Sequence, residues 1–157
     1  MQNAGTDFTK LSLALGLLVA LVSQATAESP ADTAKRWGLI GPWSLDCSLP
    51  ADRGVGTVLS YEIVDGDRLI HRRYFGGGSD ESEVVGATIS ANGVLNLRIY
   101  FPEFKETREL GLMKSSDDAM RAVYNRGKNG RYSIKGGKFT ANGKPTPAQH
   151  KCERAPV

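Results

Sequence analysis

The chain has 157 residues and a formal net charge of +3, with 20 Lys and Arg residues against 17 Asp and Glu residues. This charge is too mild to indicate a nucleic-acid-binding protein. The length fits one domain with a real hydrophobic core and argues against a second domain.

The first 27 residues have the pattern of a cleavable signal peptide. Lys10 precedes an apolar run from Leu11 to Val22, and a small-x-small cleavage pattern ends at Ala27. The run is shorter than the roughly 20 apolar residues that span a bilayer. We therefore expect a periplasmic or secreted chain with no transmembrane segment after cleavage. Its predicted parts are the signal peptide (1–27), a linker with a short helix (28–40) and a β domain (41–157).

A short helix is predicted at the start of the mature chain. Ser29 suits the N-cap and Pro30 the first helical position. Gly38 is a typical helix stop. The helix should therefore cover one or two turns and end at Trp37.

Short alternating segments replace the helical pattern beyond this point. Residues 57–64 and 68–75 flank an Asp65-Gly66 hairpin turn, and Asn92-Gly93 precedes the clearest strand, residues 94–101. Further strands are expected around residues 85–89, 110–112, 120–124 and 132–134. The large side chains predicted to point inward are Trp43, Tyr61, Phe75, Phe101, Tyr124 and Phe139, with the small residues Val85, Ala87 and Ala122 between them.

These segments predict an all-β fold. Consecutive antiparallel strands joined by tight turns form a meander, and a meander of about eight strands commonly closes into a small barrel. A β-sandwich is the main alternative, although it normally needs long crossover connections that this sequence lacks.

Cys47 and Cys152 are the only cysteines. Export would place them in an oxidising compartment, where a disulfide persists, and two cysteines allow a single intramolecular connectivity. We expect a structural bridge that ties the first strand to the end of the chain.

Two resemblances follow from sequence motifs. Gly41-Pro42-Trp43 resembles the G-x-W opening of lipocalins and related calycins, which implies a lipocalin-like barrel whose tryptophan lies under a basic residue near the C-terminus, here Arg154. Residues 37–152 also resemble a group of uncharacterised small secreted proteins from alphaproteobacteria. That resemblance rests on WGLIGPWSLDC, on FPEF followed by Thr107-Arg108, on YNRGKNGRYSIKGGKF and on ANGKPTP.

Catalytic and metal-binding motifs are not recognisable in the sequence. His71 and His150 have no metal-ligand spacing to each other, to a cysteine or to paired carboxylates. No G-x-S-x-G motif occurs, and the glycine triplet at 76–78 lacks the Lys-Ser/Thr of a phosphate-binding loop. The sequence therefore predicts neither an enzyme nor a cofactor.

The segment His71-Arg72-Arg73 places basic side chains on both faces of a regular strand. One of Arg72 and Arg73 would then point into the barrel and need a carboxylate or an anionic ligand as partner. A bulge, or an arginine that reaches water at the barrel mouth, is the alternative. The candidate ligand contacts are Arg72, Arg73, Tyr61 and Tyr124.

The last part of the chain is strongly basic, with nine Lys and Arg residues against one acid in positions 119–157. A surface patch is predicted from Arg121, Arg126, Lys128, Arg131 and Lys135. Such a patch could bind an anionic envelope component or an acidic protein, or could merely balance the acidic middle strands. Two functions stay open: a carrier of a small apolar or anionic ligand, and a non-enzymatic interaction protein such as an inhibitor of a periplasmic enzyme or an envelope adaptor.

Overall fold

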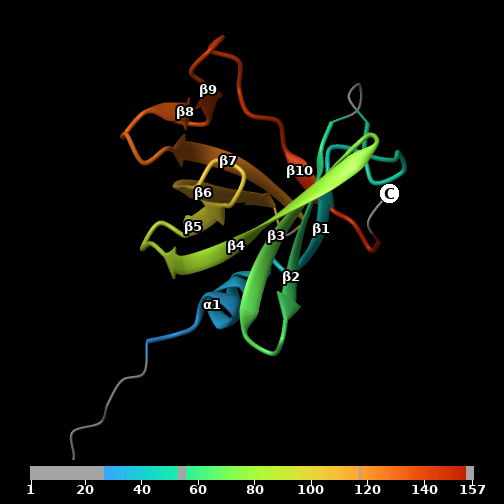
Figure 1. The fold of residues 1–157 in the computed structure, drawn as a ribbon. Helices are drawn as coiled ribbons and strands as arrows, with labels where there is room; N and C mark the ends of the chain where they lie inside the picture. Colours follow the sequence, from blue (N-terminus) through green and yellow to red (C-terminus); the bar gives the residue numbers. More distant parts are fainter. Residues whose placement is uncertain (1–26, 53–55, 117, 155–157) are drawn as a thin grey trace, which may run out of the picture.

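The computed structural model describes residues 27–52, 56–116 and 118–154, so the predicted signal peptide, apart from Ala27, lies outside the described residues. One helix precedes a series of strands (Figure 1). Their bounds are α1 (Pro30–Trp37), β1 (Gly41–Ser44), β2 (Val58–Val64), β3 (Arg68–Phe75), β4 (Gly78–Ile89), β5 (Leu95–Phe101), β6 (Glu106–Ser116), β7 (Ala119–Arg126), β8 (Tyr132–Lys135), β9 (Lys138–Phe139) and β10 (Gln149–Lys151).

The strands close into an antiparallel barrel. Strands β1 to β7 pair with their neighbours in chain order, and β10 pairs with β7 on one side and with β1 on the other. The ring therefore contains eight strands, β1 to β7 and β10. Closure leaves no free edge along the ring, which is the general advantage of a barrel over an open sheet. The predicted barrel is confirmed, and the sandwich alternative is excluded.

Strand β7 has a different partner along each half. Its first residues pair with β10, whereas Tyr124 to Arg126 pair with β8. The β8–β9 hairpin therefore extends beyond the ring, and residues 140–148 lead from it back to β10 (Figure 1). The strand predicted around residues 132–134 is confirmed as β8, and it lies outside the ring.

Helix α1 has the predicted ends. The Ser29 hydroxyl accepts a hydrogen bond from the backbone N–H of Asp32, and Gly38 takes a left-handed conformation with φ 85°. The indole N–H of Trp37 donates to the carbonyl of Gly93 at 2.9 Å. Trp37 thus ties the end of the helix to the turn between β4 and β5, while the helix itself lies against β4 and β3.

Trp43 in β1 is fully buried in the core. Its indole N–H donates to the carbonyl of Leu39 at 2.7 Å. The basic residue over its ring is Lys151, whose Nζ lies 5.6 Å from the ring centroid and donates to the carbonyl of Gly38 at 3.0 Å. The role predicted for Arg154 therefore belongs to Lys151, because strand β10 ends at this residue and Arg154 lies beyond it, exposed to solvent.

Cys47 and Cys152 form the predicted disulfide, with Cα atoms 5.5 Å apart. The backbone N–H of Cys152 also donates to the carbonyl of Pro42 at 2.9 Å. The bridge thus lies beside the pairing of β10 with β1, the last and first strands of the chain.

Two β-bulges change which side chains face the interior. The register of β4 against β5 skips Val85, and the register of β7 against β6 skips Val123. An extra residue reverses the alternation of side chains beyond it. Val85 is consequently 44% exposed, and Tyr124 lies on the outer face. Both were predicted to point inward, and both predictions are wrong for this reason.

Phe75 was also predicted to point inward and is instead 41% exposed. It is the last residue of β3 and pairs with Gly78, the first residue of β4. The side chain therefore stands at the tip of the hairpin, beyond the packed interior.

The outward position of Tyr124 is stabilised by Gly111. The ring lies against the bare backbone of this glycine, and the phenol oxygen donates to Oδ1 of Asn96 at 2.7 Å. A methyl group at position 111 would overlap Cδ1 and Cε1 of the ring. We expect Gly111→Ala to lower the free energy of unfolding by about 1–3 kcal/mol, measured by urea denaturation.

Gly86→Ala is the matched control, since a methyl group there would lie 3.5 Å from Arg98, an ordinary contact distance. Gly86→Ala should lower the free energy of unfolding by less than Gly111→Ala does. Equal stability of the two variants would show that the Tyr124–Gly111 contact contributes little.

Candidate functional site

The barrel encloses a cavity of about 240 Å³. Its walls are largely aliphatic and aromatic, with side chains from β2, β5, β6, β7 and the β8–β9 hairpin. The apolar lining consists of Leu59, Ile99, Phe101, Leu110, Leu112, Ala122, Ile134, Phe139 and Pro147. A mostly apolar interior with a few convergent polar groups is typical of a small-molecule site.

The cavity lies at the end of the barrel away from α1. Trp37 of the helix contacts Gly93, just before β5 begins, whereas the cavity is lined by Ile99 and Phe101 near the end of β5. Phe139 and Pro147 line the cavity and are also exposed to solvent. They mark a mouth beside the β8–β9 hairpin.

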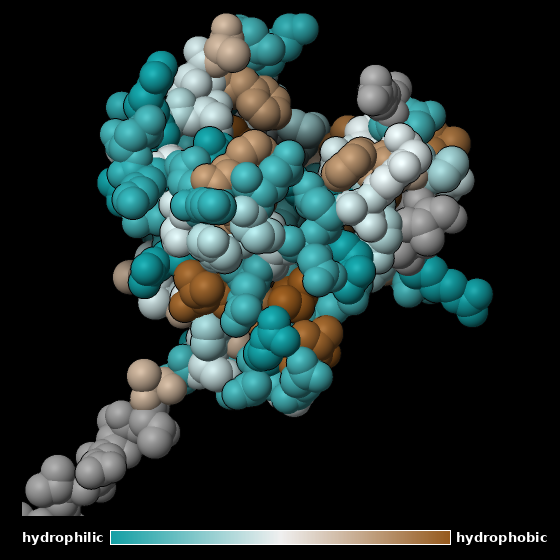
Figure 2. Space-filling view, in the orientation of Figure 1, coloured by the Kyte–Doolittle hydropathy of each residue, from teal (hydrophilic) through white to brown (hydrophobic). Residues whose placement is uncertain are grey.

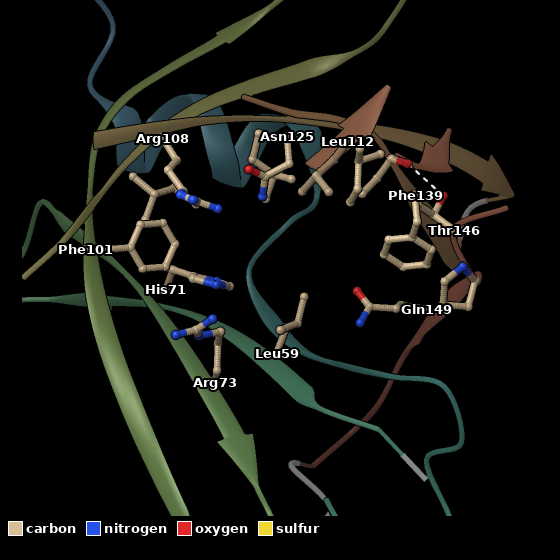
Figure 3. Close-up of a pocket in the computed structure, with 15 residues that line it drawn as sticks. Leu59, His71, Arg73, Phe101, Arg108, Leu112, Asn125, Phe139, Thr146 and Gln149 are labelled. Atoms are coloured by element: carbon tan, nitrogen blue, oxygen red, sulfur yellow. Dashed lines mark hydrogen bonds between the residues drawn. The ribbon is translucent and has the colours of Figure 1, made fainter. Parts of the chain in front are cut away.

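Four polar side chains converge on one side of the cavity. His71 and Arg73 come from β3, Arg108 from β6 and Asn125 from β7. Figure 3 shows His71, Arg73, Arg108 and Phe101 grouped on one side of an open space, opposite Phe139 and Gln149. Three buried atoms in this group have no hydrogen-bond partner among the described residues: Nδ1 of His71, Nε of Arg108 and Oδ1 of Asn125.

Arg73 already has a protein partner. Its Nε donates to Oδ1 of Asp80 at 2.8 Å, and Nη2 pairs with the other oxygen of the same carboxylate. The guanidinium also lies 5.3 Å from the ring centroid of Phe101. Asp80 therefore balances the charge of Arg73 and holds the guanidinium beside the cavity.

His71 is 4% exposed and packs between two aromatic rings. Its ring centroid lies 4.9 Å from that of Tyr61 and 6.4 Å from that of Phe101. Burial and the neighbouring charge of Arg73 lower the pKa of His71 to about 4. The imidazole is therefore neutral at pH 7.

Of the candidate ligand contacts, the structure places only Arg73 in the lining of this cavity. Arg72 points to the other face of β3, where Nη2 lies 3.1 Å from Oε2 of Glu81 and 3.6 Å from Oε2 of Glu62. Tyr61 is buried behind His71, with no hydrogen-bond partner for its hydroxyl among the described residues. Tyr124 lies outside the barrel. The two arginines alternate as a regular strand requires, and the inward one has a carboxylate partner.

Arg108 and Asn125 line the cavity and were not singled out from the sequence. Arg108 is two residues before Leu110, and both line the cavity, so extending the alternating pattern backwards would have found it. Asn125 could not be found in this way, because the bulge at Val123 reverses the pattern before it.

The predicted basic residues belong to β7, β8 and the turn between them. Arg126 pairs with Glu109, and the charges of Arg126 and Lys135 lie 6.0 and 5.4 Å from the ring centroid of Tyr132. Lys128 and Arg131 lie in the β7–β8 turn, and Arg121 is exposed on β7. Figure 2 shows one face of the molecule, on which hydrophilic side chains predominate and hydrophobic ones form small groups. The charge of Arg126 is thus paired with an acid of the neighbouring strand β6.

Residues 27–52, 56–116 and 118–154 contain no group of three or more His, Cys, Asp or Glu side chains that could hold a metal ion. The same residues include no helix long and apolar enough to cross a membrane. No family model matches the chain, and comparisons with curated proteins and with solved structures found no significant match. The cavity and its polar side are therefore the features on which a function can be argued.

Proposed function

We propose that the protein is an exported, lipocalin-like binding protein that holds one small, partly apolar molecule inside its barrel. The observation that carries this proposal is the cavity of about 240 Å³, whose apolar walls adjoin a group of buried polar atoms that have no hydrogen-bond partner among the described residues. A polar atom buried without a partner costs free energy, and a bound molecule that supplies the partner recovers it.

The volume limits the size of the molecule. A water molecule takes a share of about 30 Å³ in the liquid, so the cavity has room for roughly eight to ten non-hydrogen atoms. A barrel of eight strands is just wide enough to hold one small ligand when its interior is not filled by side chains.

Export is supported by the disulfide. Bridges of this kind form and persist outside the cytoplasm, and this one joins Cys47 to Cys152 across 105 positions. Together with the predicted signal peptide, it favours a periplasmic or secreted location for the binding protein.

Ala122→Phe tests the container directly. Ala122 lines the cavity, and a benzyl group there would occupy space that a ligand needs. Wild-type protein purified gently from its own cell envelope should carry a small molecule visible by native mass spectrometry. The variant should have lost that molecule and should melt at the same temperature or higher, because the new side chain fills a void.

The same spectra should give a chain that begins at Glu28.

Val123→Phe is the matched control. Val123 is the neighbouring residue but borders a groove outside the barrel, beside Met113 and Tyr132. This variant should retain the small molecule. Absence of any adduct in the wild type, with a loss of about 1–3 kcal/mol in the Ala122→Phe variant, would show a filled interior. That result would favour the interaction protein over the carrier.

A further inference from the structure

We propose that the ligand of the barrel is a small amphipathic monoanion, such as a carboxylate with a short alkyl chain, and that Arg108 binds its anionic head. This inference rests on the proposed binding function and names the class of ligand. It follows from the charges that line the cavity.

The polar side of the cavity carries two arginines, and no Asp or Glu is among the described residues of its lining. The charge of Arg73 is balanced by Asp80 through a two-pronged contact. Arg108 is therefore the cation whose pairing is least complete.

The guanidinium of Arg108 is held less tightly than that of Arg73. It forms an ion pair with Glu106, whose Oε2 lies 3.6 Å from Nε, too far for a hydrogen bond. The other oxygen of Glu106 accepts the backbone N–H of Lys128 at 2.9 Å. Nε of Arg108 is buried with no hydrogen-bond partner among the described residues, and Figure 3 shows the guanidinium directed into the cavity.

A carboxylate suits this guanidinium in shape and charge. Arginine is always protonated and presents donors in a planar fork, which binds the two oxygens of a carboxylate. The neutral His71 ring can donate a hydrogen bond to the same head through Nδ1, whereas Oδ1 of Asn125 is an acceptor and needs a donor such as water. A cationic head would meet two arginines here and no lining carboxylate.

The rest of the cavity suits an alkyl chain. Its apolar lining includes Leu59, Leu112, Ala122 and Phe139, and Figure 3 shows Leu112 and Phe139 across the open space from Arg108. Because the volume admits roughly eight to ten non-hydrogen atoms, the chain should be short. Octanoate, with its carboxylate at Arg108 and its methyl end towards Leu112, is a probe of this size.

Isothermal titration calorimetry with octanoate, octanol and octylamine tests the inference on the wild-type protein after any copurified molecule has been removed. Octanoate should bind more tightly than octanol, and octylamine should bind weakest. Octanol binding as tightly as octanoate would overturn the anionic head while leaving the barrel a container. Absence of binding by all three, in a protein that still carries a molecule from its cell envelope, would also overturn this inference and not the binding function.

The Arg108→Gln variant tests whether the anionic head binds at Arg108. It should weaken the binding of octanoate about tenfold and leave the binding of octanol unchanged. The effect is modest because the Arg108 side chain is 37% exposed and partly screened by water. Arg98→Gln removes the same charge from an exposed position on β5 and should leave octanoate binding unchanged. An equal loss in both variants would mean that net charge acts at long range, and Arg108 would not be the anchor. Because the comparison of the three probes needs no variant, it tests the anionic head even if Arg108→Gln fails to fold.

Discussion

Replacing the disulfide through Cys47→Ser with Cys152→Ala should lower the free energy of unfolding by about 4–5 kcal/mol and the melting temperature by roughly 10–15 °C. The bridge closes a loop of 105 positions, and cross-linking so long a loop removes much conformational freedom from the unfolded chain. Alanine is chosen at position 152 because this residue is buried, so serine would add an unpaired hydroxyl. Differential scanning calorimetry measures both quantities.

Reduction provides the control for the disulfide variant. A reducing agent should bring the wild type close to the melting temperature of the variant and should leave the variant itself unchanged. If the oxidised wild type and the variant melt together, the bridge does not stabilise the barrel.

The second large effect is a loss of stability in mild acid caused by His71. The pKa of this residue is about 4 in the folded protein and about 6.5 in an unfolded chain. Between these values the unfolded chain binds more protons, so the stabilisation is complete above pH 6.5 and falls as the pH is lowered towards 4. The loss should be on the order of 3 kcal/mol over this interval, measured by urea unfolding at successive pH values.

His71→Gln should remove this part of the pH dependence while leaving that of the carboxylates. His150→Gln is the matched control, because His150 is exposed on β10 and its removal should leave the wild-type curve unchanged. Parallel curves for the wild type and His71→Gln would contradict the burial of a neutral imidazole in the folded barrel.

Local patterns were sufficient to predict the helix and the regular strands. Ser29, Pro30 and Gly38 define the ends of α1 by short-range chemistry, and the structure agrees at each position. Leu95, Leu97, Ile99 and Phe101 alternate with polar residues, and all four are buried. Such features depend on residues close together in the chain, so the sequence alone predicts them.

The missed features depend on pairing between distant strands. A bulge such as the one at Val123 depends on how β7 pairs with β6, and no single residue type at this position predicts it from the sequence. The closing strand β10 has only three residues, Gln149 to Lys151, too few for a hydrophobic period. The polar side of the cavity was therefore predicted only in part: Arg73 follows from a regular strand, while Asn125 depends on the bulge.

The place of β10 also determines the order in which the barrel can assemble. The strand that joins β7 to β1 is supplied by residues 149–151, so a nascent chain can form the meander early but cannot complete the ring until these residues have emerged. Until then β1 and the first half of β7 are open edges, able to pair with other chains. Contacts between residues so far apart in sequence form slowly. The edges of β1 and β7 therefore stay uncovered until residues 149–151 have been made.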